Sequence, residues 1–172
     1  MRTLKKLNLQ QLETEAEVIR ELDLKSILGG TGVITTVNMC FFDNMESFSN
    51  QFGCGFSEND LMNSFDSMFG AGAHFNVTPA MATQFCNSTF NAAHVDNNQI
   101  GSTVSAGTNV STDYYTYTSG GTAITHAVTL TYYDSVHQTY IAKDTTSNTN
   151  IVLTASQVAA GGYAEAVYGC TP

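Results

Sequence analysis

A cysteine, a histidine and an aspartate in this chain have the types and contexts that nucleophilic acyl-transfer chemistry needs. Cys40 stands at the start of an amphipathic run. His126 is the only titratable residue of the strand-like stretch 122–130, and Asp144 ends the next strand-like run. A thiol attacks as thiolate, a neighbouring histidine takes its proton, and a carboxylate orients the imidazole ring. We therefore expect Cys40 to be a nucleophile, His126 its general base and Asp144 the residue that orients His126.

Three helices are predicted after residue 30, and the first would position the cysteine. It follows an extended arm at residues 31–37, begins beside Cys40 and ends at Gly53, with apolar residues at helical spacing between. Ser57 is a candidate N-cap for the second helix, and Thr78 before a proline for the third. A helix start lowers the pKa of a thiol beside it, so Cys40 should be acidic there. The backbone N–H of Cys40 would also be free to bind an oxyanion.

The second half of the chain predicts strands, which would position the other two residues. Short β-rich runs separated by turn residues lie at residues 99–104, 114–118, 123–133, 139–142, 151–153 and 164–168. The connection at residues 134–138 predicts a hairpin, which would return Asp144 to the neighbourhood of His126. Helices followed by an antiparallel sheet predict the α+β class.

The order of these features resembles the papain-like cysteine peptidases, in particular a compact bacterial type whose third catalytic residue is aspartate. The resemblance covers residues 38–168. It rests on Cys40 followed by two phenylalanines, on the sequence Thr-His-Ala-Val around His126, and on the sequence Ile-Ala-Lys-Asp that ends at Asp144. It implies a papain-like fold, with N-terminal helices packed on a C-terminal antiparallel sheet, and a peptide substrate.

The resemblance is incomplete at the oxyanion hole. Papain-like enzymes usually carry a glutamine several residues before the cysteine, and residues 31–39 contain none. Asn38 is the candidate for this second donor. Loss of one oxyanion donor costs about 10²–10³ in rate, so the missing glutamine would lower the catalytic rate by this factor if no other group replaces it.

The thirty residues at the N-terminus differ in composition from the rest of the chain. They hold five of the six basic residues and a formal charge of zero, so the net charge of −9 belongs to residues 31–172. Apolar residues recur at helical spacing before the Gly29-Gly30 pair. An ordinary N-terminal helix capped by glycine would explain this pattern. The coincidence of the glycines with the change in charge favours a processing site.

This segment resembles the double-glycine leaders of exported bacterial peptides, on Ile19, Leu24 and Ile27 followed by Gly29 and Gly30. The resemblance implies that residues 1–30 form a leader. The apolar residues would be recognised by a peptidase-containing ABC transporter, which would cleave after Gly30. Residues 31–172 would then be a secreted peptidase domain.

Several other functions are disfavoured by composition. Residues 31–172 contain a single basic residue, Lys143, so nucleic acid and anionic membranes are improbable partners. No run is long enough to span a membrane. The cysteines lack metal-ligand spacing, and no phosphate-binding loop is present, so we expect neither a metal nor a cofactor.

The other cysteines and histidines have structural interpretations. We expect a disulfide between two of Cys54, Cys86 and Cys170, without a preferred pair. The remaining histidines are expected on the surface: His74 and His94 because they lie in loop-like contexts without an acid at a useful offset, and His137 because it lies in the hairpin turn.

Two other functional classes stay open. In one, the chain is a non-catalytic exported protein, bacteriocin-like or binding, whose cysteines pair and whose His126 is structural. In the other, it is a precursor peptide modified at Ser, Thr and Cys, which the globular patterning of residues 31–172 disfavours.

Overall fold

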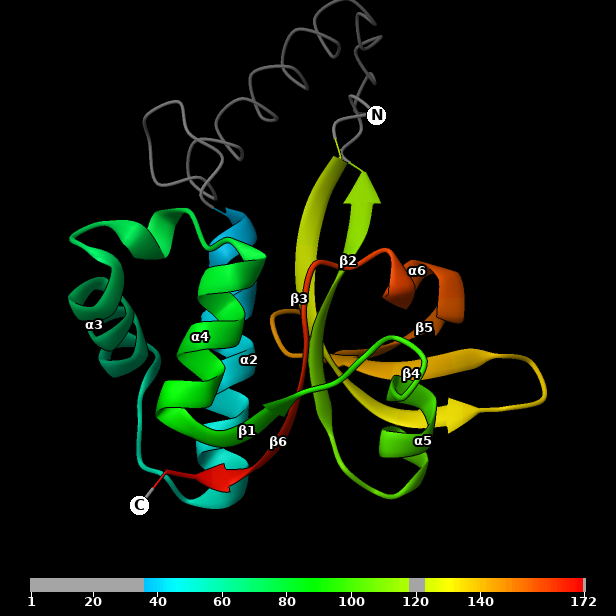
Figure 1. Cartoon of the computed structure of the whole chain (residues 1–172). Coiled ribbons are helices and arrows are strands. Elements are labelled where there is room, and N and C mark those ends of the chain that lie inside the picture. The colour runs from blue at the N-terminus through cyan, green and yellow to red at the C-terminus, as the bar shows by residue number, and fades with distance from the viewer. Residues whose placement is uncertain (1–35, 118–122, 172) are drawn as a thin grey trace, which may run out of the picture. The chain divides into compact units, whose positions relative to one another are not determined.

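The computed structural model describes residues 36–117 and 123–171, and the residues from Val37 onward form one compact unit. Three helices lie together on one side of a sheet (Figure 1). They are α2 (Thr36–Phe52), α3 (Glu58–Phe69) and α4 (Pro79–Thr89), with the short 3-10 helix η1 (Ala73–Phe75) between the last two. Among the described helices, none is both long and apolar enough to cross a membrane.

One antiparallel sheet of six strands makes up the rest of the described unit. Its strands are β1 (Phe90–His94), β2 (Val110–Tyr117), β3 (Ala123–Asp134), β4 (Thr139–Asp144), β5 (Thr149–Thr154) and β6 (Ala164–Cys170). They lie in the order β1-β6-β2-β3-β4-β5, so the last strand of the chain pairs with both the first and the second. The expected α+β class, with N-terminal helices packed on a C-terminal antiparallel sheet, is confirmed.

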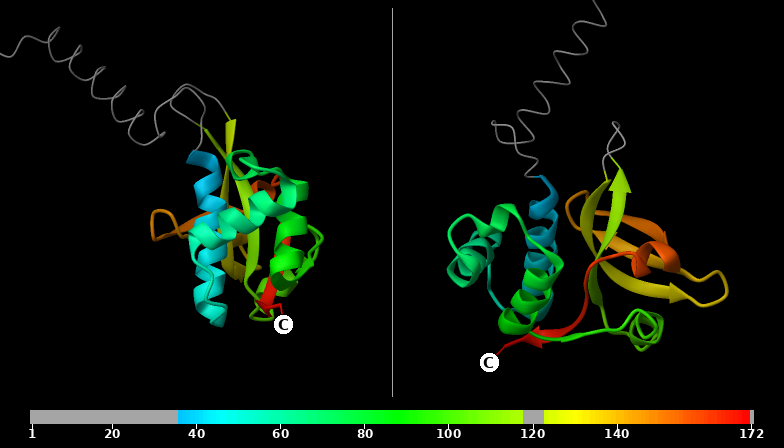
Figure 2. Two further views of the ribbon diagram at one scale, coloured as in Figure 1. Left: turned by 90° about the vertical axis from the view of Figure 1, so that its left-hand side faces the viewer. Right: turned by 45° about the horizontal axis from the view of Figure 1, so that its top comes forward.

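The buried apolar side chains form two clusters. Figure 2 shows the ribbon from two further sides, with the helices of the first half of the chain beside the sheet. On the side of α2, α3 and α4, phenylalanines dominate, and the rings of Phe41 and Phe42 meet edge to face with centroids 5.1 Å apart. The second cluster includes the short helices α5 (Ile100–Ser105) and α6 (Ala155–Ala159). Strand β3 serves both clusters, because side chains alternate between the faces of a strand. Ala127 packs in the first cluster and Val128 in the second.

Local capping signals predicted the beginnings of two helices correctly. Ser57 caps α3 and forms a capping box with Asp60, and the side chain of Thr78 accepts from the N–H of Met81 at the start of α4. These bonds satisfy N–H groups that have no partner within the helix.

Several expected boundaries are wrong. Helix α2 begins at Thr36, inside the expected extended arm, so Cys40 lies in its second turn rather than at its start. Residues 99–104 were expected as a strand, but α5 forms there, because Ile100 and Val104 are four residues apart and bury one face of a helical turn. Strand β1, which begins at Phe90 and pairs with β6, was not among the expected strands.

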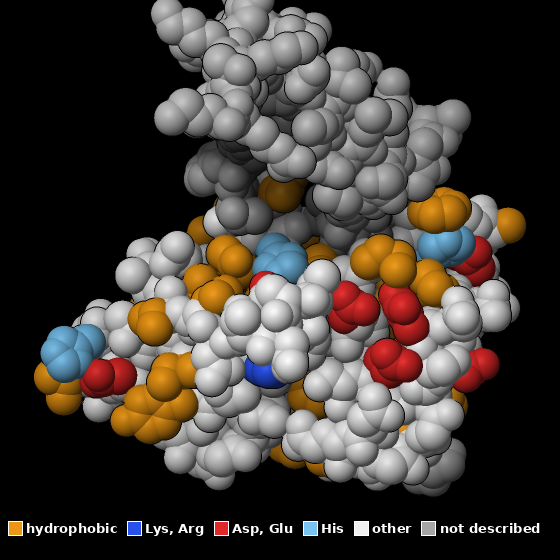
Figure 3. All heavy atoms as spheres, turned by 180° about the vertical axis from the view of Figure 1, so that it is seen from behind, with side chains coloured by type: hydrophobic (Ala, Val, Ile, Leu, Met, Phe, Trp, Pro, Cys, Tyr) orange, Lys and Arg blue, Asp and Glu red, His pale blue; other side chains and the backbone are white. Residues whose placement is uncertain are grey.

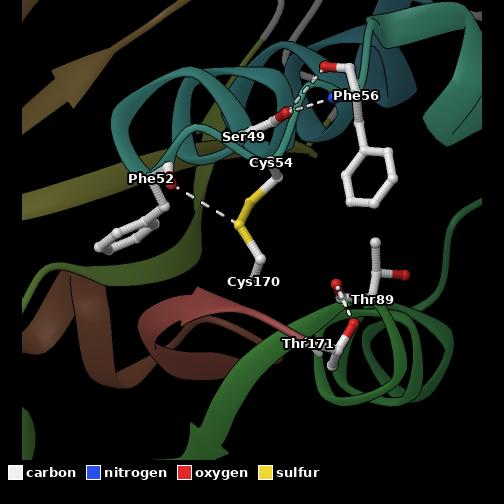
Figure 4. The surroundings of a disulfide bond; sticks show 7 residues. All are labelled: Ser49, Phe52, Cys54, Phe56, Thr89, Cys170 and Thr171. Atoms are coloured by element: carbon white, nitrogen blue, oxygen red, sulfur yellow. Dashed lines mark hydrogen bonds between the residues drawn. A yellow bond between two sulfur atoms is a disulfide. The ribbon is translucent and has the colours of Figure 1, made fainter.

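The expected disulfide joins Cys54 and Cys170 (Figure 4). The Cα atoms are 5.6 Å apart, within the usual range. Beside it, the Ser49 hydroxyl closes the loop after α2, accepting from the Phe56 N–H at 2.7 Å and donating to the Phe56 carbonyl at 2.9 Å. The disulfide ties the end of β6 to the residues just after α2. Cys40 and Cys86 lie outside the disulfide, and both are buried.

Candidate active site

Cys40 lies where helix α2 meets strand β3. Its side chain is 2% exposed, and its Sγ accepts a hydrogen bond from the backbone N–H of Ala127 at 3.3 Å. The ladder between β3 and β4 begins with the pair Thr129 and Lys143, so Ala127 lies beyond the end of that ladder. The thiol therefore takes a β3 backbone donor at a place where β4 does not run alongside. Ala127 directly follows His126, which places the sulfur beside the backbone of the candidate base.

His126 and Asp144 form an ion-pair geometry across neighbouring strands. His126 Nε2 lies 3.1 Å from Asp144 Oδ1, and both side chains are largely buried. Because Asp144 engages Nε2, Nδ1 is the ring nitrogen left for proton exchange with another group. The ring of Tyr114, on β2 opposite His126, meets the imidazole edge to face at 5.8 Å between centroids. The predicted hairpin thus brings these two residues together.

The turn after β4 holds the Asp144 carboxylate in place. Oδ1 accepts from the Thr146 N–H at 3.1 Å and the Ser147 N–H at 3.3 Å, and Oδ2 accepts from the Ser147 hydroxyl at 2.7 Å. Partial burial raises the pKa of Asp144, but the Ser147 hydrogen bonds and the interaction with His126 outweigh it, so the pKa is lowered. Asp144 is therefore ionised and held where it can orient the imidazole.

The resting thiol is protonated. Burial raises the pKa of Cys40 to about 11, and the charges of Asp43 and Asp144 act in the same direction. The backbone N–H groups of Ala127 and Phe41 lower it, with a smaller effect than burial. The expectation of an acidic thiol at a helix start is thus wrong for this structure, because Cys40 lies in the second turn of α2 and out of water. A nucleophilic Cys40 must lose its proton to a base during attack.

The oxyanion donors differ from the expected ones. Cys40 is the fifth residue of α2, and in an α-helix the fifth N–H already donates within the helix. The backbone N–H of Cys40 is therefore not free to bind an oxyanion. The prediction from the sequence that it would be free is wrong. Asn38 lies two residues earlier in α2, and its side chain is outside the described part of the structure.

Asn44 is a positioning residue that the sequence analysis missed. It is fully buried, one turn after Cys40 on α2. Its amide donates to the Ser111 hydroxyl at 2.9 Å and to the Val128 carbonyl at 3.2 Å, and its carbonyl accepts from the Thr129 hydroxyl. These bonds fix α2 on β3 at the level of the thiol. The sequence did carry a signal for Asn44, because a polar residue on the apolar face of an amphipathic helix needs buried hydrogen-bond partners.

The other histidines each lie close to an acid. Asp66 lies 2.8 Å from His74, Glu165 3.0 Å from His94, and Asp134 2.6 Å from His137. His94 and His137 are exposed as expected, whereas His74 is largely buried, and the expectation that His74 and His94 lack an acid is wrong. Sequence offset missed His94 and Glu165 because a strand pairing, not a local turn, joins them.

The proposed leader residues lie outside the described part of the chain. They are Ile19, Leu24, Ile27, Gly29 and Gly30. In the described part, no group of three or more His, Cys, Asp or Glu side chains has the arrangement of a metal site. The structure brings His126 and Asp144 together and places the Cys40 sulfur on the backbone of Ala127, the residue after His126. Compared with known proteins, the sequence matches no protein-family model, and no curated protein matches it either.

Proposed function

We propose that this chain is an exported papain-like cysteine peptidase or transpeptidase that acts through a thioester on Cys40. His126 is the base and then the acid, Asp144 orients it, and Asn38 is the candidate side-chain donor to the oxyanion. Peptide is the substrate class, since the resemblance to papain-like enzymes sets the reaction as acyl transfer. The protein is released from its leader after Gly30 by a peptidase-containing ABC transporter.

The observation that carries this proposal is the position of the three side chains. The Cys40 sulfur accepts a hydrogen bond from the backbone N–H of Ala127, the residue after His126, and His126 Nε2 lies 3.1 Å from Asp144 Oδ1. A nucleophile, a base beside it and a carboxylate that orients the base form the arrangement of a catalytic triad. Residues far apart in the sequence come together only through the helix-to-sheet packing.

The reaction follows from the protonation states. As the Cys40 sulfur bonds to the carbonyl carbon of the peptide, its proton passes to Nδ1 of His126, and Asp144 stabilises the resulting imidazolium. The C–N bond then breaks, and His126 returns the proton to the leaving amine. Water, deprotonated by His126, attacks the thioester, releases the acid and restores the thiol. An amine in place of water gives a transpeptidase.

The disulfide agrees with export. Disulfides persist in oxidising compartments and are rare in the reducing cytosol, so the Cys54–Cys170 bond favours a protein that works outside the cell.

A non-catalytic exported binding protein is the second candidate. The observation that favours it is the raised pKa of Cys40, to about 11, which is typical of a buried thiol without chemical function. In such a protein His126 and Asp144 would be a structural pair that closes the end of the sheet.

Turnover of fluorogenic peptide amides by the full-length chain tests the proposal. We expect hydrolysis that disappears in Cys40→Ala and persists in Cys86→Ala, since Cys86 is the other buried thiol. Thermal unfolding of each variant checks that its fold is retained. No turnover of a broad peptide library, or turnover that survives Cys40→Ala, would reject the peptidase and leave the binding protein.

A further inference from the structure

A pocket lies beside the candidate nucleophile, on the side of the helices. Phe41 and Ala127 form the wall nearest Cys40, and Thr78 and Pro79 at the beginning of α4 form another. Tyr163, which is buried, closes it from the segment before β6. Ala127, whose backbone N–H donates to the Cys40 sulfur, is thus also part of the pocket wall.

The carboxylate of Asp113 is the single ionisable acid among the residues that line this pocket. It comes from β2, opposite Ala127, and is only 5% exposed. Its Oδ1 accepts from the Gly162 N–H at 2.6 Å and from the Tyr163 N–H at 3.2 Å. Among the described residues, no hydrogen-bond donor lies on Oδ2. One oxygen is therefore held by the fold, and the other is available to a ligand.

Burial raises the pKa values of Tyr163 and Asp113, the two titratable residues that line this pocket. Burial raises the pKa of the Tyr163 hydroxyl well above its usual range, and the charges of Asp113 and Cys40 contribute to the same rise. The pKa of Asp113 is also raised, because the effect of burial exceeds that of the Gly162 and Tyr163 N–H donors, which lower it. A buried carboxylate with one free oxygen is costly unless a cation pairs with it.

Gly161 and Gly162 allow the chain before β6 to lie close to Asp113 and Pro79 in the pocket wall. A Cβ at Gly161 would lie 2.2 Å from the Asp113 backbone oxygen, and a Cβ at Gly162 would lie 2.3 Å from Cγ of Pro79. Any larger residue would push the wall away, so the Gly161-Gly162 pair is required by this close approach. The pocket is a built feature rather than a gap between elements.

We propose that this pocket is the specificity pocket of the peptidase and that it binds a lysine or arginine side chain of the substrate through Asp113. The proposal rests on the proposed function. The charge of the chain agrees with it, because residues 31–172 carry the whole net charge of −9 and a single basic residue, Lys143. Acidic side chains gather on one face (Figure 3), so cationic peptides would be attracted to this protein.

A cation explains the pocket better than a neutral donor does. A hydroxyl or amide would give Oδ2 one hydrogen bond but would leave the buried charge of Asp113 unpaired. An ammonium or guanidinium group supplies both the hydrogen bond and the opposite charge.

Fluorogenic peptides in which lysine, norleucine or glutamate is scanned through the positions around the cleavage site test this inference. At one position, lysine should raise kcat/KM about tenfold or more over norleucine, and glutamate should lower it. Asp113→Asn keeps the oxygen that accepts from Gly162 and Tyr163 but removes the charge. It should abolish the lysine preference, so that the lysine and norleucine peptides give equal kcat/KM. Asp96→Asn, an equal charge change at an exposed carboxylate, should keep the preference.

Binding to Cys40→Ala, measured by calorimetry, separates this inference from the proposed function. The lysine peptide should bind about tenfold more tightly than the norleucine peptide, and Asp113→Asn in the same background should remove the difference. Equal binding of the two peptides, no binding of either, or a preference that survives Asp113→Asn overturns the inference. If this preference is found in a chain that hydrolyses no peptide, the pocket stands and the peptidase fails.

Discussion

His126 Nε2 lies 3.1 Å from Asp144 Oδ1, and the carboxylate is itself held by the N–H groups of Thr146 and Ser147. The turn after β4 therefore fixes the carboxylate, the carboxylate fixes the imidazole, and Nδ1 is left for the proton of a nucleophile. The hairpin between β3 and β4 positions both partners without help from the helices.

Removal of the carboxylate charge should impair catalysis far more than binding. In Asp144→Asn, the amide can donate to Nε2 and stabilise the wrong tautomer, so kcat should fall by about 10³ or more while peptide KM changes little. Steady-state kinetics on a fluorogenic peptide give both values. Asp134→Asn is the matched control, because Asp134 pairs with the exposed His137 at the far end of the hairpin. Equal losses in the two variants would argue against a special role for Asp144.

The Cys40 thiol should resist simple alkylation at neutral pH. A pKa of about 11 leaves about a hundredfold less thiolate than the ordinary value of 9.0, because each unit is tenfold. Iodoacetamide should therefore modify Cys40 at a rate that rises with pH until about 11, as mapped by mass spectrometry. Denatured protein is the control, since its cysteines titrate normally. Rapid modification of Cys40 at pH 7 would contradict the buried, protonated thiol.

Asn44 should be needed for stability and for the position of the nucleophile. Asn44→Leu removes an amide that bonds to Ser111, Val128 and Thr129, and leaves their polar groups buried without a partner. We expect a loss of about 2–4 kcal/mol in the free energy of unfolding, measured in urea. Asn50→Leu, at an exposed position of the same helix, should change it by less than about 0.5 kcal/mol. Similar values for both variants would show that Asn44 does not anchor α2.

The disulfide should contribute strongly to stability. It closes a loop with a sequence separation of 116 residues, for which chain entropy predicts a contribution of about 4–5 kcal/mol. Reduction should therefore lower the thermal midpoint of the wild type. The double variant Cys54→Ala, Cys170→Ala should start with a low midpoint and show no further change on reduction. A wild-type midpoint that is insensitive to reductant would mean that this bond is not formed in solution.

Local chemistry made part of this structure predictable. The N-caps Ser57 and Thr78 could be identified because a capping side chain bonds to a backbone N–H only two or three residues away. The hairpin that joins His126 to Asp144 was predicted from two β-rich runs and a short connection, and the α+β class followed from the order of the elements.

The features that the sequence did not predict depend on contacts between residues far apart in the chain. The β-branched residues before Asn38 suggested an extended arm, yet α2 begins at Thr36, because helix propensity is a weak prior that tertiary context overrides. Nothing local to Asn44 identifies Thr129 as its partner. The pairing of Cys54 with Cys170 was equally out of reach, since connectivity cannot be deduced from the sequence for cysteines 116 residues apart.

The most direct test of the central claim is to trap the acyl-enzyme. The full-length chain would be mixed with a peptide p-nitrophenyl ester, quenched in acid within milliseconds to seconds, and examined by intact mass and peptide mapping. We predict one acyl group on Cys40, its formation lost in His126→Ala and unaffected in Cys86→Ala. Acylation that is absent from Cys40, or that proceeds equally well without His126, would contradict a thiol activated by this histidine.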